Sequence, residues 1–292
     1  MKNSDIQTLI QKYFLQRLMA QRNVSSETIK SYRDTFRLYL KYIETCHGVP
    51  PAKISIAQFD AEHILGFLSY LDKERGNSAK TINNRLAALH SFAKYLIFEL
   101  PEYSGLLTRS LKVPFRKDEK RQMEFLTEDK FDALKSACET NTALGRRDML
   151  MLLLLYNTGI RVSELVGLKL GSIHIDSHGT TAYIQVYGKG RKERDVPLWG
   201  STAKYLTGYL RDHARGENNN LFANCTDGDL TRSGVRYRLG CLQKKASETI
   251  PSLAKKNITP HTFRHTTALR MLQSGVDIST IASSAGKRVQ NA

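Results

Sequence analysis

Four basic residues in the second half of the chain have side chains suited to holding a phosphate group. They are Arg161, Lys189, His261 and Arg264. A guanidinium makes two directed bonds to phosphate oxygens and stays charged. His261 and Arg264 stand three residues apart, so on a helix they share a face and can address one phosphate. Arg264 would then balance developing charge while His261 assists proton transfer.

Arg161 follows a segment that predicts a rigid support. The run 149–155 is apolar on every side, which indicates a central buried helix, and Asn157-Thr158-Gly159 is a stop signal. Arg161 should therefore leave the edge of the core directly after a forced turn. Glu164, three residues later, could orient Arg161 or a neighbour.

A small β element should hold Lys189. Residues 172–176, 182–187 and 194–198 read as strands, and the second of these alternates apolar and polar side chains. Lys189, between two glycines, would then lie at a hairpin tip. Taken alone, such a lysine is more typical of a solvated loop.

The helix that carries His261 and Arg264 should begin at Thr259-Pro260. His261 and His265 stand four residues apart, as in a metal-binding His-Glu-x-x-His helix, but the required Glu is missing and Arg264 occupies the same turn. The pattern disfavours a metal site. The four cysteines, at 46, 138, 225 and 241, have no paired close spacing, so neither a zinc knuckle nor a disulfide framework is indicated. No cofactor is expected.

The composition favours a polyanionic partner. Lys and Arg number 44 against 28 Asp and Glu, which gives a formal net charge of +16. Ribosome-associated proteins, heparin binders and proteins of anionic membranes share such an excess, so charge alone does not decide among them. No secretory signal stands at the start, and the apolar run 149–156 is too short to cross a bilayer, so we expect a cytoplasmic location.

The first third of the chain predicts four helices with helical apolar spacing. Ser25 and Ser26 are capping candidates for the second helix, Asp60 opens the third, and the fourth follows Gly76-Asn77-Ser78. On the fourth, Lys80, Thr81, Asn84 and Arg85 lie away from the apolar stripe and carry donors of the type that contact phosphates and base edges. A solvated helix face is the alternative interpretation. Lys30 and Arg33 are secondary candidates.

The fold class expected is mainly α with a small antiparallel β element. Residues 1–108 form an N-terminal helical domain, 109–125 a charged linker with a proline, and 126–292 a second domain. Thr127 should cap the first helix of the second domain, with Glu128 and Asp129 in its first turn.

The order of Arg161 in its Thr-Gly-Ile-Arg-Val-Ser-Glu-Leu context, Lys189 in Gly-Lys-Gly, and His261-x-x-Arg264 resembles the tyrosine recombinase family, which includes phage integrases and Xer-like proteins. The resemblance covers nearly the whole chain. It implies a SAM-like core-binding domain that grips one side of duplex DNA, followed by a catalytic domain. It makes Lys189 the general acid and Arg191 a DNA contact. Family members use a 3′-phosphotyrosyl intermediate, need no metal or nucleotide, and form tetramers on DNA.

The chain departs from the family pattern near its end. The family has a second His or Trp after Leu-Gly and a nucleophilic Tyr nine residues later, whereas no His follows His265 and no Tyr follows Tyr237. With Gly286 in register, Lys287 stands in place of that His. The expectation is a site-specific recombinase or integrase of a mobile element whose autonomous cleavage is unsupported and whose tetramer is weakened.

The alternative to a recombinase is a catalytically inactive DNA-binding protein that occupies or regulates recombination sites. A type IB topoisomerase uses related chemistry, but the two-domain layout and the motif around Arg161 make it the weaker interpretation.

Overall fold

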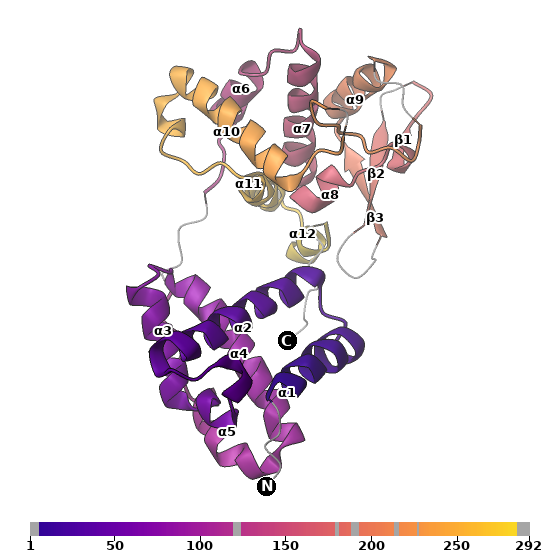
Figure 1. The fold of residues 1–292 in the computed structure, drawn as a ribbon. Helices are drawn as coiled ribbons and strands as arrows, with labels where there is room; N and C mark the ends of the chain where they lie inside the picture. The colour runs from indigo at the N-terminus through magenta and orange to yellow at the C-terminus, as the bar shows by residue number, and fades with distance from the viewer. Residues whose placement is uncertain are drawn as a thin grey trace. The chain divides into compact units, whose positions relative to one another are not determined.

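The structure, a computed structural model, describes residues 6–118, 124–178, 181–187, 193–212, 216–226 and 228–284, with side chains described up to residue 281. The chain divides into two compact units, Met1–Lys120 and Arg121–Ala292, called here the N-terminal unit and the C-terminal unit (Figure 1). The division falls inside the segment expected to be the linker.

The N-terminal unit is helical in its described part. Its helices are α1 (Ile6–Lys12), the π-helix η1 (Tyr13–Gln21), α2 (Ser26–His47), α3 (Ala61–Lys73), α4 (Ala79–Glu99) and α5 (Ser104–Leu111), with short 3₁₀ turns at Pro51–Lys53, Ile56–Phe59 and Pro101–Tyr103. The side chains of Ser25, Asp60 and Ser78 accept hydrogen bonds from the backbone at the starts of α2, α3 and α4. These are the helix starts that the sequence indicated.

Aromatic rings fill the core of the N-terminal unit. Phe92 of α4 lies 5.1 Å, centroid to centroid, from both Tyr13 and Phe36, and 5.3 Å from Phe59. All four rings are buried. Edge-on packing of this kind adds to the free energy of area burial, and it makes α4 the central helix of the unit.

A fifth helix, α5, was not among the four that the sequence predicted. Leu107 is fully buried, and the Ser110 hydroxyl donates to the Phe59 carbonyl at 2.7 Å. Beyond it, Val113 is buried in the same core, and the Asn83 side chain donates to the Arg116 carbonyl at 2.9 Å. Residues up to 116 therefore pack on the N-terminal unit. Eight residues with one buried leucine leave too weak a periodicity to detect.

The C-terminal unit combines helices with one small sheet. Its helices are α6 (Glu128–Ser136), α7 (Ala143–Thr158), α8 (Val162–Val166), α9 (Gly200–Asp212), α10 (Arg232–Thr249), α11 (Pro260–Gln273) and α12 (Ile278–Ser284), with 3₁₀ turns at Leu170–Ser172 and Pro251–Leu253. The strands β1 (Ile173–Ile175), β2 (Ala182–Tyr187) and β3 (Glu193–Leu198) form an antiparallel sheet in the order β1-β2-β3. The expectation of a mainly α fold with a small antiparallel β element is confirmed.

Helix α7 is the centre of the C-terminal unit, with α9 and α11 packed against it (Figure 1). Leu150, Met151, Leu154 and Leu155 are fully buried, as the all-round apolar run predicted. The ring of Tyr156 stacks on Phe131 of α6 with centroids 3.6 Å apart. Packing on several sides makes the end of α7 a fixed platform for the residues that follow it.

Candidate functional site

The end of α7 determines where Arg161 emerges. Gly159 has φ +59° and its N–H donates to the Leu155 carbonyl at 3.0 Å. A Cβ added at Gly159 would meet the side chain of Thr267 at 3.1 Å, so both the left-handed backbone and the close approach of α11 require glycine. Ile160 is buried, and Arg161 then occupies the N-cap position of α8 with its side chain 29% exposed.

The Glu164 carboxylate holds Arg161 by two bonds. The Arg161 backbone N–H donates to Oε2 at 2.8 Å and its guanidinium donates to Oε1 at 2.9 Å. The Glu164 side chain is 4% exposed. Burial raises its pKa, but hydrogen bonds from Arg194 and Arg161 outweigh burial, and the pKa of Glu164 is lowered. This buried carboxylate, whose charged form the two arginines favour, thus holds Arg161 by both its backbone and its side chain.

Arg194 of β3 is a site residue that sequence reasoning missed. Its guanidinium donates to both Glu164 oxygens, at 3.2 and 2.9 Å. The alternation along β3 offered a signal, because Arg194 shares a face with the buried Val196 and Leu198. A cation on the inward face of a strand calls for a buried carboxylate, although the sequence does not say which one.

Arg264 joins this group from α11. Its guanidinium donates to the Gly159 carbonyl at 2.8 Å. Burial, followed by the nearby charges of Arg161 and Arg194, lowers the pKa of Arg264, while Glu164 opposes the shift. Arg161, Arg194, Arg264 and Glu164 are called here the arginine cluster. Three guanidinium groups against one carboxylate leave excess positive charge, which is the electrostatic requirement for an anion site.

His261 is exposed in the first turn of α11, one turn before Arg264. His265, one turn further on, is also exposed. Within the described ranges, no group of three or more His, Cys, Asp or Glu side chains is placed to hold a metal ion. Lys189 and Arg191 lie outside the described residues; the two strands that precede and follow them pair in register from Tyr187 with Glu193.

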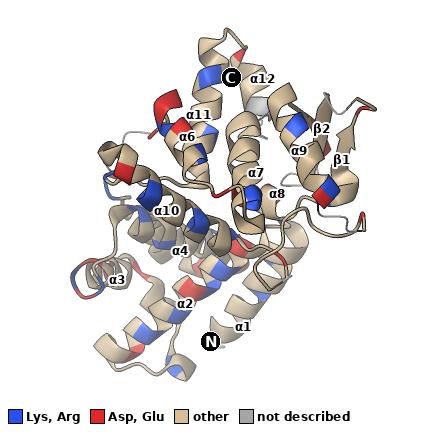
Figure 2. Cartoon of the chain, turned by 90° about the horizontal axis from the view of Figure 1, so that it is seen from above, with Lys and Arg blue, Asp and Glu red and all other residues tan. Residues whose placement is uncertain are grey.

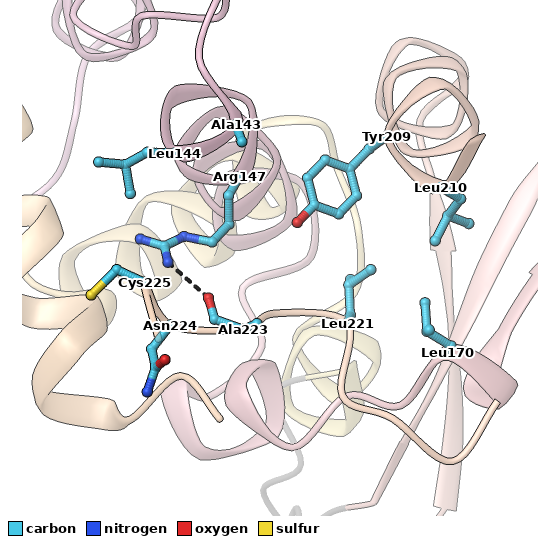
Figure 3. Close-up of a pocket in the computed structure, with 10 residues that line it drawn as sticks. All are labelled: Ala143, Leu144, Arg147, Leu170, Tyr209, Leu210, Leu221, Ala223, Asn224 and Cys225. Carbon is cyan, nitrogen blue, oxygen red and sulfur yellow. Dashed lines mark hydrogen bonds between the residues drawn. The ribbon is translucent and has the colours of Figure 1, made fainter. Parts of the chain in front are cut away.

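A cavity of about 340 Å³ in the C-terminal unit lies apart from the arginine cluster. Its walls come from the start of α7, from α9 and from residues 221–225 (Figure 3). The one charged residue in its lining, Arg147, donates to the Ala223 carbonyl at 2.7 Å and to buried Asp148 at 3.3 Å. The Arg147 guanidinium is thus used inside the unit, whereas the arginine cluster carries the excess positive charge that an anion site requires.

The candidates on α4 belong to the N-terminal unit. Lys80 and Asn84 are exposed, whereas the Thr81 hydroxyl bonds to the capping Ser78 hydroxyl at 3.1 Å. Arg85 is partly buried, and burial, followed by the charge of Arg75, lowers its pKa. Of the four, Lys80 and Asn84 are therefore the most available to a ligand.

The secondary candidates on α2 are both exposed and both paired. Lys30 lies 3.6 Å from Glu27, and Arg33 lies 3.6 Å from Asp34. Lys and Arg recur along α2 and α10 (Figure 2).

No helix of the described ranges is both long enough and apolar enough to span a membrane.

Comparison with known protein families places both units. The profile of the phage integrase family matches residues 124–288, and the profile of the phage integrase N-terminal SAM-like domain matches residues 11–99. The first match covers more than half of the chain. The chain therefore belongs to the phage integrase family, the tyrosine-type site-specific recombinases.

Curated relatives agree along nearly the full chain. The "Putative integrase/recombinase y4rC" of Sinorhizobium fredii is 41% identical over 281 residues, which are 96% of this chain and 84% of that protein. The tyrosine recombinase XerD of Oceanobacillus iheyensis is 35% identical over 280 residues, 94% of this chain and 88% of that protein. The family indicated by the order of the motifs is confirmed.

Solved structures share the fold. A lambda integrase tetramer bound to a Holliday junction has a TM-score of 0.70 at 18% identity, covering 99% of this chain and 76% of that one. The Tn1549 transposon integrase in complex with circular intermediate DNA also has a TM-score of 0.70 at 18% identity, covering 98% and 92%.

Proposed function

We propose that the arginine cluster binds one phosphodiester of double-stranded DNA during strand cleavage and rejoining. The observation that carries the proposal is the double anchoring of Arg161 and Arg264: the first is held by buried Glu164 and the second by the Gly159 carbonyl. Guanidinium groups that are already oriented stabilise charge on a phosphoryl group without reorganising during the reaction. Arg161 and Arg264 are the proposed catalytic arginines, with Glu164 in support.

His261 and Lys189 complete the proposed reaction. His261 stands one helical turn from Arg264 and is exposed, so its imidazole can exchange a proton with a phosphate ligand at the same helix start. Lys189 is proposed to protonate the leaving 5′-hydroxyl. In this scheme a tyrosine hydroxyl, for which no residue of this sequence matches the family motif, attacks phosphorus and forms the 3′-phosphotyrosyl link while the 5′-oxygen leaves with the Lys189 proton. Reversal of that step would rejoin the strand. No metal or nucleotide takes part in this scheme.

DNA is the proposed partner, and an oligomer on DNA is the proposed assembly. Lys80, Asn84, Thr81 and Arg85 on α4 and Arg191 beside Lys189 are the proposed DNA contacts outside the arginine cluster. The net charge of +16 supports a polyanionic partner. Related folds include a lambda integrase solved as a tetramer on a Holliday junction and as a dimer on a core site. Integration or excision of a mobile element in the cytoplasm is the proposed setting.

The proposal is tested in two stages. Duplexes bound by the full chain are first selected from a random library, and the selected sequence is then offered as a nicked substrate that traps a covalent adduct. An adduct that disappears with Arg161→Ala supports the recombinase.

Two other results would redirect the proposal. In the first, the chain binds a selected sequence but forms no adduct, and Arg161→Ala at most weakens binding. The function would then be that of a protein that occupies recombination sites, not that of a recombinase. In the second, no sequence is selected from the library, which would exclude both the recombinase and the protein that occupies recombination sites.

A further inference from the structure

The N-terminal unit contains a cavity of about 540 Å³ whose charged lining residues are all cations. Arg17 of η1, Arg22 just after it and Lys94 of α4 supply them. Arg17 donates to the neutral Gln21 amide oxygen at 2.9 Å. Within the described residues, none of the three cations forms an ion pair with a carboxylate. This surface is called here the basic cavity.

Three like charges around one cavity repel one another unless an anion lies among them. His90, also in the wall, is buried and donates from Nε2 to the Ser110 carbonyl at 3.1 Å. Burial, followed by the charge of Lys94, lowers its pKa. The Nε2 of His90 is thus used inside the unit, and Arg17, Arg22 and Lys94 supply the charge of the cavity wall.

Aromatic rings form the rest of the wall. Phe115 is 54% exposed, and its ring meets His90 edge-on with centroids 5.4 Å apart. Tyr32 is half-buried, while Tyr95 is 7% exposed and its hydroxyl has no hydrogen-bond partner among the described residues. Exposed rings next to cations are the combination that binds nucleotides, because bases stack on rings and phosphates pair with cations.

The position of the basic cavity on α4 adds a second argument. Lys80, Asn84, Ala87, Ser91 and Lys94 follow one another at spacings of four and three, so they share one face of the helix. At 1.5 Å per residue, Asn84 and Lys94 stand about 15 Å apart along the axis. The basic cavity thus continues the face that carries the most exposed DNA-contact candidates.

We propose that the basic cavity is a binding site for a single nucleoside phosphate, with the phosphate held by Arg17, Arg22 and Lys94 and the base against Phe115 and Tyr32. The ligand has two possible sources, a free nucleotide or an unpaired nucleotide of DNA. The second source rests on the proposed function, whereas the first does not.

The first experiment measures binding of dAMP, deoxyadenosine and inorganic phosphate to the full chain by titration calorimetry. Saturable dAMP binding is expected, with deoxyadenosine and inorganic phosphate each weaker by about tenfold, since each lacks one half of the ligand. Absence of saturable dAMP binding, or equal affinity for dAMP and inorganic phosphate, would overturn the proposal.

Variants locate the site. The triple change Arg17→Gln, Arg22→Gln and Lys94→Gln should weaken dAMP by about tenfold or more. The matched control, Lys12→Gln, Lys41→Gln and Lys53→Gln, removes the same charge from exposed positions outside the cavity. Equal loss in both would show attraction to net charge only and would overturn the site.

A single substitution at an exposed position tests the site without the risk that a triple variant fails to fold. Phe115→Ala removes a largely exposed ring and should weaken dAMP while leaving inorganic phosphate unchanged. Equal affinity for dAMP before and after this change would overturn the assignment of the ring.

Competition then separates the two sources. Displacement of dAMP by a duplex with an unpaired 5′ nucleotide, but not by a blunt duplex of equal charge, would assign the cavity to DNA. Displacement by neither would assign it to a free nucleotide, and the cavity would stand even if sequence-selective DNA binding failed. Equal displacement by both duplexes would overturn the proposal of a single-nucleotide site.

Discussion

At the scale of single residues, Glu164 decides how Arg161 is held. One carboxylate with 4% exposure accepts bonds from two guanidinium groups and from the Arg161 backbone. Removing the charge would leave both arginines partly buried beside another cation, Arg264. Arg194 acts through Glu164, so it is a positioning residue: the carboxylate shared by the two arginines transmits its effect to Arg161.

Glu164→Gln should destabilise the C-terminal unit by about 3 kcal/mol, because breaking a buried charge pair leaves its partners uncompensated. Urea unfolding measures the change. The control is Glu139→Gln, which breaks an exposed pair with Lys245 at 2.7 Å and should lower the free energy of unfolding far less, because water and salt screen exposed pairs. Similar losses in both variants would show that burial of Glu164 contributes little.

The same carboxylate predicts a pH dependence. The pKa of Glu164 is lowered in the folded chain, so the unfolded chain takes up its proton at a higher pH than the folded chain does. The stabilisation by ionised Glu164 is complete above the unfolded pKa, about 4.3, and is lost as pH falls through the folded pKa. The stability difference between wild type and Glu164→Gln should therefore shrink below about pH 4.3. A constant difference between pH 7 and pH 3 would contradict the assignment.

At the scale of elements, the junction of α7 and α11 builds the site. Thr267 of α11 donates to the Tyr156 carbonyl at 2.9 Å, and Arg264 donates to the Gly159 carbonyl one turn away. The last turn of α7 is thus held by two side chains of α11. Any shift of α11 would move Arg264 relative to Arg161, so the packing of these two helices controls the spacing within the arginine cluster.

Gly159→Ala should cost about 2–5 kcal/mol, because left-handed strain of about 1–2 kcal/mol adds to contact with Thr267, for which overpacking costs about 1–3 kcal/mol. Gly275→Ala is the control in the same unit: its φ is +78° but nothing lies within 4 Å of an added Cβ. It should show the strain alone. The free energies of unfolding of the two variants give the difference, and equal values would exclude a contribution from the α7–α11 contact.

At the scale of the whole molecule, the charge balance governs affinity for DNA. With a net charge of +16, binding should weaken steeply with salt as condensed counterions are released. The slope measures how many phosphates the chain contacts. The salt dependence of binding therefore distinguishes residues that contact a phosphate from residues that only raise the overall positive potential.

Lys80→Ala and Arg161→Ala should each reduce the slope of log K against log salt by about 0.9, the value for one phosphate contact. Lys41→Ala, which removes an exposed cation outside both sites, should weaken binding slightly and leave the slope unchanged. Fluorescence anisotropy over a salt series gives the slopes. An unchanged slope for Arg161→Ala would mean that the arginine cluster does not bind DNA phosphate.

Much of the fold could be predicted from local sequence. Three helix starts were predicted at Ser25, Asp60 and Ser78, and the apolar run 149–155 predicted the buried helix. Both signals are local, because capping and periodicity act within a few residues. The helix α5 was not predicted from the sequence. Its stability comes from Leu107 and Ser110 contacting distant parts of the chain, so its own periodicity carries little signal.

The sequence by itself determined the residue types of the site, the order of the motifs and the family, since these depend on identity and spacing along the chain. Only the tertiary structure decided that Arg194 shares Glu164 with Arg161, and that Arg17, Arg22 and Lys94 surround one cavity. Arg194 lies 30 residues from Glu164, and Lys94 lies 77 residues from Arg17. Such contacts arise from the packing of whole helices and strands, which a local pattern does not encode.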